Sequence, residues 1–129
     1  MTNALLVGSI MREADKHLKQ FLSYMHRQIA KEAGVKIGKL RLIKYKNPKS
    51  SRVFGQVDVD TGNIELAIRN SKGEFYAIKS YLNTLCHEVA HIIIYNEYGD
   101  EVADHGHQFQ KENRKLRRKI DKLIKTSCY

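Results

Sequence analysis

The sequence is poor in proline, cysteine and tryptophan, with one, two and none of these in 129 residues. The single Pro48 excludes long proline-rich linkers, and Cys86 and Cys128 are too few for the disulfide framework of a small secreted protein. No apolar run approaches a membrane span, and the apolar residues 1–11 include neither a basic leader nor a cleavage site. We therefore expect a soluble protein of the cytoplasm or nucleus, without membrane association and monomeric by default.

The order of the hydrophobic patterns predicts an α+β fold. Apolar residues recur at helical spacing over residues 9–33, and Gly34 is suited to end this helix. Residues 40–46 have the composition of a strand, and residues 53–59 and 64–68 alternate around a turn, which predicts a hairpin in a small antiparallel sheet. Two more helices follow, the last running to about residue 125 with a basic face. A hydrophobic content of 42% suffices for one core, so we expect a single domain over residues 1–129.

The most informative segment is His-Glu-x-x-His at residues 87–91. On a helix, His87 and His91 share one face and can bind one metal ion, while the neighbouring Glu88 can act as general base. Neither proline nor glycine interrupts residues 76–98, which favours a helix. The apolar stripe of this helix is expected to comprise Ile78, Tyr81, Leu82, Leu85, Val89 and Ile92. Two histidines and an acid on an otherwise apolar helix are costly to bury without a cation, so we predict a zinc site.

A catalytic zinc ion usually has three protein ligands and one open position. A metzincin would have glycine and histidine where this chain has Ile94 and Glu97, so that pattern is excluded. His105 is the preferred third ligand, because Gly99 and Gly106 allow the chain to turn back toward the helix.

Two alternatives for the third ligand stay open. Glu112 lies at a tolerable distance for a thermolysin-like glutamate ligand, although its lysine and arginine neighbours better suit a surface ion pair. His107 is the other candidate, and it could also occupy the fourth position of the metal.

Charge is distributed unevenly along the chain. Residues 1–50 carry eleven Lys/Arg against three acids, and residues 106–129 carry eight against two. Residues 76–105 have Lys79 against five acids, which suits cation binding. Five basic residues of the last helix share one side and form a basic ridge: Lys111, Lys115, Arg118, Lys122 and Lys125. This ridge could follow the phosphates of nucleic acid without reading bases, or it could be an ordinary solvated helix face.

The segments Thr84-Leu85-Cys86-His-Glu-x-x-His and His105-Gly106-x-x-Phe109 together resemble the SprT-like zinc metallopeptidases. The resemblance covers essentially the whole chain. It implies a minimal zincin-like domain with an N-terminal helix, a small antiparallel sheet, the metal helix and a final helix. It also implies His87, His91 and His105 as zinc ligands, Glu88 as general base and Phe109 as a structural residue.

The same resemblance implies cleavage of DNA-bound or DNA-crosslinked proteins with DNA as activator, as in DNA repair, and favours nucleic acid as the partner of the basic ridge. The chain departs from the family pattern in two ways. His107 stands where the family often has proline, and no cysteine-rich zinc ribbon is present. Any DNA contact is therefore expected from the catalytic domain.

The predicted reaction is zinc-assisted peptide hydrolysis with Glu88 as base. His107, Tyr95 and Tyr98 are unranked candidates for stabilising the oxyanion. We expect an extended peptide to pair with an exposed edge of the hairpin at residues 64–69. Two other functions stay open: a non-catalytic zinc-stabilised DNA-binding module and a general peptidase independent of DNA. The presence of Glu88 argues against the first, and the basic ridge argues against the second.

Overall fold

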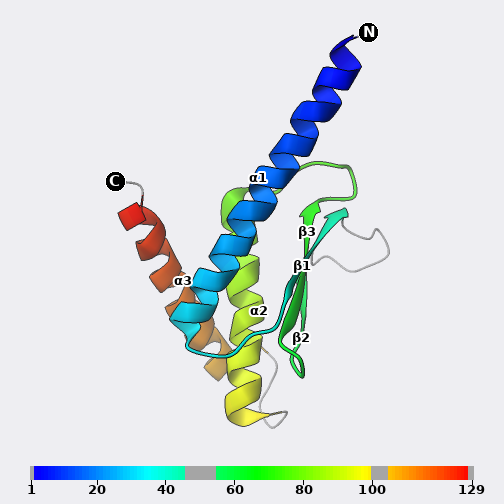
Figure 1. The fold of residues 1–129 in the computed structure, drawn as a ribbon. Coiled ribbons are helices and arrows are strands. Elements are labelled where there is room, and N and C mark those ends of the chain that lie inside the picture. Colours follow the sequence, from blue (N-terminus) through cyan, green and yellow to red (C-terminus); the bar gives the residue numbers. More distant parts are fainter. Residues whose placement is uncertain (1, 46–54, 100–104, 128–129) are drawn as a thin grey trace.

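The computed structural model describes residues 2–45, 55–99 and 105–127, with side chains described over residues 12–44, 55–99 and 105–126. Helix α1 (Thr2–Ala33) is followed by strands β1 (Leu40–Tyr45), β2 (Gly55–Asp58) and β3 (Asn63–Arg69) and by helices α2 (Ile78–Tyr98) and α3 (His107–Ser127) (Figure 1). The expected α+β class and element order are confirmed. Helix α1 begins seven residues earlier than predicted, and residues 2–8 contain no proline that would oppose this extension.

The sheet is mixed, so the prediction of a wholly antiparallel sheet was wrong. Its strand order is β1-β3-β2, with β3 antiparallel to β2 and parallel to β1. The predicted hairpin is therefore present, but β1 pairs with the other side of β3. A tight turn fixes the polarity only of the strands that it joins, and no such turn joins β1 to β3.

The central position of β3 also corrects the expected substrate edge. β3 pairs with β1 over residues 64–69 and with β2 over residues 63–66, so it is the central strand, and residues 64–66 have no edge open to a further strand. The outer strands of the described sheet are β1 and β2. Of these, β2 packs against α2, the helix that contains the His-Glu-x-x-His segment.

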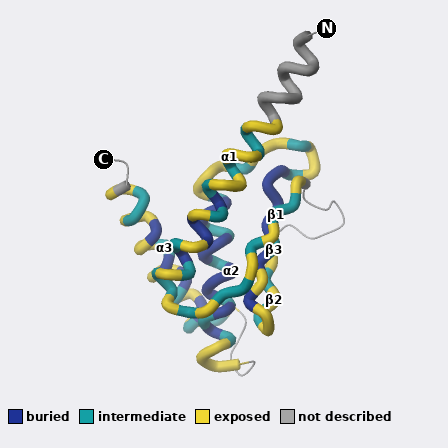
Figure 2. Tube along the Cα trace, in the orientation of Figure 1, coloured by how far each residue is buried: buried dark blue, intermediate teal, exposed yellow. Residues whose placement is uncertain are grey.

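Helix α2 is the centre of the structure, because α1, α3 and β2 all pack against it (Figure 1). The buried residues are concentrated in α2 and β3 (Figure 2). The core combines apolar side chains of all three helices and β3: Leu22, Met25, Ile29, Ile64, Leu66, Ile68, Leu82, Leu85, Val89, Ile92, Leu116 and Ile120. Five members of the predicted α2 stripe are buried, but Ile78 is 51% exposed because it is the first residue of the helix and lies beyond the core.

The first turn of α2 is anchored to the end of β3. The buried Tyr81 hydroxyl donates to the Ile68 carbonyl over 2.5 Å and accepts the Tyr76 amide over 3.0 Å. At the other end of α2, Gly99 has a positive φ of 64° and donates its N–H to the Tyr95 carbonyl, as expected of a C-terminal glycine. These contacts fix where α2 begins and ends, and thus the position of His87 and His91 relative to the sheet.

A buried ion pair joins α1 to the end of β3. The Arg69 guanidinium lies 3.0 Å from the Asp15 carboxylate and donates to the Gly73 carbonyl over 2.7 Å. Both side chains are largely buried, at 6% and 14% exposed. No helix in the described part of the chain is long and apolar enough to cross a membrane.

Candidate metal centre

Helix α2 brings the two histidines of the motif together. His87 and His91 are one helical turn apart, and their Nε2 atoms lie 3.2 Å from each other. Both side chains are partly exposed, while the neighbouring Glu88 is buried, at 5% exposed. The segment therefore places two imidazoles at the boundary between the core and solvent, with a buried glutamate next to His87 in the helix.

His105 completes a group of three. Its Nε2 atom lies 3.2 Å from that of His87 and 3.0 Å from that of His91. His105 directly precedes α3, whose first turn is closed by the Gln110 amide donating to the Gly106 carbonyl over 3.0 Å. The start of α3 thus presents His105 to the face of α2 that contains the other two histidines. We call His87, His91 and His105 the histidine triad.

The triad has the donor set and the spacing of a zinc site. Zinc–nitrogen bonds of about 2.0–2.1 Å at tetrahedral angles place ligand nitrogens about 3.3 Å apart, close to the 3.0–3.2 Å found here. A neutral imidazole has only one N–H, so three mutually facing Nε2 atoms cannot all be satisfied by hydrogen bonds to one another. The three histidines therefore fit a metal ion better than they fit each other.

Phe109 forms a platform beneath the triad. Its ring is 1% exposed, and its centroid lies 4.9, 4.5 and 5.0 Å from those of His87, His91 and His105. Edge-on and tilted packing of this kind restricts the imidazole rings and keeps water from their inner side. The structural role that the resemblance implies for Phe109 has this contact as its physical basis.

Cys86 precedes His87 but points into the core. Its side chain is 1% exposed, and burial raises the pKa of the thiol to about 12. Among the described residues, the group able to hold a metal ion contains the triad and no cysteine. Cys86 is thus a buried apolar residue, as expected. Cys128 lies outside the described residues.

The two alternative third ligands, His107 and Glu112, both lie on α3. His107 is exposed at the first residue of the helix, and Glu112 is partly buried on the helix. Neither belongs to the metal-capable group among the described residues. Tyr98, a candidate for the oxyanion, is the last residue of α2 and is 37% exposed.

Tyr95, the remaining oxyanion candidate, is engaged in a contact that the sequence did not reveal. Its hydroxyl donates to Oδ1 of Asp60 over 2.7 Å. Asp60 lies in the β2–β3 turn, 35 residues away, and no sequence pattern pairs the two residues. Asp60 is therefore a neighbour of the site that sequence reasoning missed.

The predicted basic ridge is present as an exposed surface of α3. Lys111, Lys115, Arg118, Lys122 and Lys125 are all exposed, while Phe109, Leu116 and Ile120 on the opposite side of the helix are buried. The contact of Arg117 Nε with Asn83 Oδ1 over 3.1 Å further fixes α3 against α2. The ridge therefore lies on the helix that packs against α2, the helix of His87 and His91, and that begins just after His105. Binding of nucleic acid to the ridge stays a prediction.

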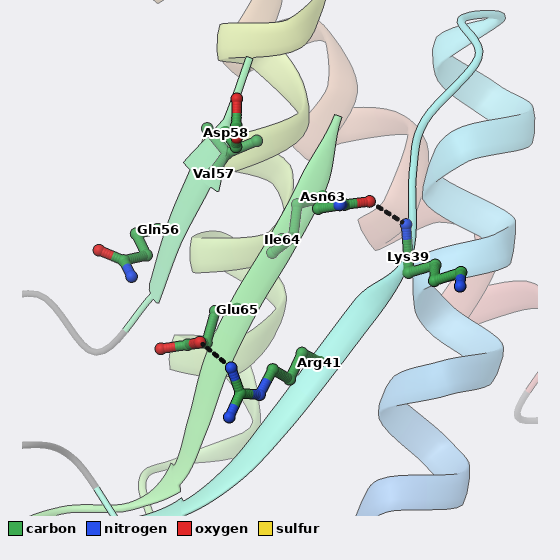
Figure 3. A pocket seen from close by; sticks show the side chains of 8 residues that line it. All are labelled: Lys39, Arg41, Gln56, Val57, Asp58, Asn63, Ile64 and Glu65. Carbon is green, nitrogen blue, oxygen red and sulfur yellow. Dashed lines mark hydrogen bonds and ion pairs between the residues drawn. The ribbon is translucent and has the colours of Figure 1, made fainter. Parts of the chain in front are cut away.

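A hollow of about 410 Å³ lies on the sheet (Figure 3). Residues of all three strands and their ends line it, and the triad contributes none. Its Arg41–Glu65 ion pair is 3.4 Å long and largely exposed, which makes its contribution to stability small. The hollow is lined by charged, polar and apolar side chains and contains none of the predicted site residues.

Comparison with known proteins identifies one family. No curated protein and no solved structure gives a significant match. A model of the SprT-like family, which is generally associated with metallopeptidases, matches residues 18–128 and so includes α2, the triad and α3. The chain therefore belongs to the SprT-like family.

Proposed function

We propose that the protein is a zinc-dependent metalloprotease that cleaves DNA-bound or DNA-crosslinked proteins, with DNA as activator. The observation that carries this proposal is the convergence of three Nε2 atoms within 3.0–3.2 Å of one another, next to a buried glutamate. A purely structural zinc site has no need of Glu88 and usually uses four protein ligands, whereas the described metal-capable group has three.

The residues of the site have separable roles in this proposal. The triad holds the ion, and Phe109 keeps the imidazoles in place from the inner side. Zinc, when bound there, supplies Lewis-acid chemistry by polarising a carbonyl group and making water more acidic. The Glu88 carboxylate accepts a proton from the attacking water and donates it to the nitrogen of the leaving amine.

The peptide substrate needs an edge strand, and β2 is the better candidate now that β3 is known to be central. One edge of β2 pairs with β3, and its other edge is unpaired within the described sheet. β2 also packs on α2, the helix of His87 and Glu88. An extended peptide pairing with β2 would gain main-chain hydrogen bonds with little dependence on its sequence.

The test of activity is cleavage of a histone by the zinc-loaded protein and by Glu88→Gln, each with and without single-stranded DNA. Cleavage that requires both Glu88 and DNA is the expected result. Equal cleavage without DNA would indicate a general peptidase, and no cleavage at equal zinc content would indicate a non-catalytic zinc module.

The test of the DNA partner uses the basic ridge. Replacing Lys115, Arg118 and Lys122 by glutamine should weaken binding of single-stranded DNA and lower its salt dependence, with a slope reduced by about 0.7 for each phosphate that the variant no longer neutralises. A matched control removes the same number of exposed charges from α1, at Lys16, Lys19 and Lys31. Equal reductions of affinity in both variants would reject the ridge as the specific DNA surface.

A further inference from the structure

The β2–β3 hairpin is attached to α2 at two places, on either side of the triad histidines of that helix. At the N-terminal side, Gly55 at the start of β2 lies against Thr84, so closely that an added Cβ would stand 2.6 Å from Thr84 Cγ2. At the C-terminal side, the Tyr95 hydroxyl donates to Asp60 over 2.7 Å. His87 and His91 lie between these two attachment points on the same helix.

The turn that contains Asp60 is itself tightly bonded. The Asp60 amide donates to Oδ1 of Asp58 over 3.0 Å, and the Gly62 amide donates to the Asp58 carbonyl over 2.7 Å. Asp58 is the last residue of β2. A displacement of Asp60 is therefore transmitted to β2 rather than absorbed by the turn.

The same hydrogen bond bears on the chemistry open to Tyr95. A tyrosine hydroxyl has one proton, and in this structure that proton is donated to Asp60. While this bond is made, the hydroxyl has no second proton to donate to an oxyanion at the metal. Its place one turn after His91 instead lets it connect the metal helix to the hairpin.

We infer that Tyr95 and Asp60 form a clasp that, together with the close Gly55–Thr84 contact, sets the position of the β2 edge relative to the triad. This rests on the proposed function, since its consequence is the alignment of an extended protein substrate on β2. Tyr95 is then a positioning residue that acts through Asp60, and it takes no part in the reaction itself.

The clasp is tested with Tyr95→Phe, Asp60→Ala and the double variant, all zinc-loaded, in peptide cleavage with single-stranded DNA present. Each single change removes the same hydrogen bond, so each should raise KM about three- to tenfold with little change in kcat. The double variant should be no worse than either single variant. Asp60→Asn keeps an oxygen acceptor and should retain most of the wild-type KM. A fall in kcat in Tyr95→Phe that Asp60→Ala does not share would overturn the inference and make Tyr95 an oxyanion donor.

A second pair of variants tests the other attachment point. Gly55→Ala should raise KM because its new methyl group collides with the Thr84 methyl group. Adding Thr84→Ser, which removes only that methyl group, should lower KM again. A double variant with the KM of Gly55→Ala alone would contradict the proposed contact.

Amide hydrogen exchange separates failure of the clasp from failure of the proposed function. Tyr95→Phe and Asp60→Ala should accelerate exchange across residues 55–62 to the same extent, whether or not the protein cleaves peptides. If the wild type is inactive but exchange changes in this way, the clasp stands and the protease function fails. Unchanged exchange in both variants would reject the clasp.

Discussion

Replacement of Phe109 by alanine is the sharpest test of how the fold holds the triad. The ring is 1% exposed and lies under all three imidazoles. Removing a fully buried phenylalanine typically costs about 3–5 kcal/mol, a large part of the total of about 5–15 kcal/mol for a domain. Phe109→Ala should therefore lower the free energy of unfolding by this amount even without metal.

With zinc present the destabilisation should be greater. Without the Phe109 platform the imidazoles must be ordered when the ion binds, so we expect zinc affinity to fall about tenfold. A ligand that binds only the folded state stabilises it according to its affinity, so tenfold weaker binding adds about 1.4 kcal/mol to the destabilisation in excess zinc.

The assay is urea unfolding with excess zinc and with a chelator, together with zinc affinity measured by chelator competition. Leu22→Ala is the matched control, because Leu22 is 0% exposed and belongs to the core on α1. It should cost about 2–5 kcal/mol equally with and without zinc. If Phe109→Ala behaves like Leu22→Ala in both conditions, the platform has no role in metal binding. A destabilisation below about 1 kcal/mol without zinc would contradict the burial of the ring.

Three buried groups allow further checks by unfolding and labelling. Burial lowers the pKa of the His26 imidazole below 6.5, so as pH falls this side chain is protonated in the unfolded chain before it is protonated in the folded protein. The free energy of unfolding should therefore decrease below pH 6.5 and level off below the folded-state pKa. In urea unfolding across this pH range, His26→Leu should show a smaller decrease. Asp15→Ala leaves the buried Arg69 without its carboxylate and should cost about 3–5 kcal/mol in thermal or urea unfolding, whereas a cost under about 1 kcal/mol would show that solvent replaces the partner. Cys86 is 1% exposed, so in the Cys128→Ser variant its thiol should react with a thiol reagent only as fast as the protein unfolds. Rapid labelling of the native protein would contradict this burial.

The sequence predicted best those features that depend only on residues close together in the chain. Two histidines at a spacing of four need only a helix to meet, and α2 forms without interruption up to Gly99. The hairpin likewise follows from alternation around a glycine-containing turn, and Gly62 has the positive φ of 76° that such a turn uses. Both features require only residues that are close in the chain.

Features that depend on distant segments were open or wrong. The spacing of His105 alone did not separate it from His107 or Glu112; the packing of Phe109 against α2 orients the start of α3 and brings His105 to the triad. The parallel pairing of β1 with β3 depends on how the sheet packs against the helices, which no turn between them encodes. The Tyr95–Asp60 bond joins residues 35 apart and left no pattern in the sequence.

One face of α2 explains why these local and distant features converge. Thr84, His87, His91 and Tyr95 follow one another at spacings of three and four, so the helix presents two metal ligands and two hairpin contacts along one side. A rotation or shift of α2 would therefore displace the ligands and the β2 edge together. Because β2 and α3 both pack directly on α2, neither the edge strand nor His105 needs a separate scaffold. Helix α2 alone can thus set the position of the triad relative to the β2 edge.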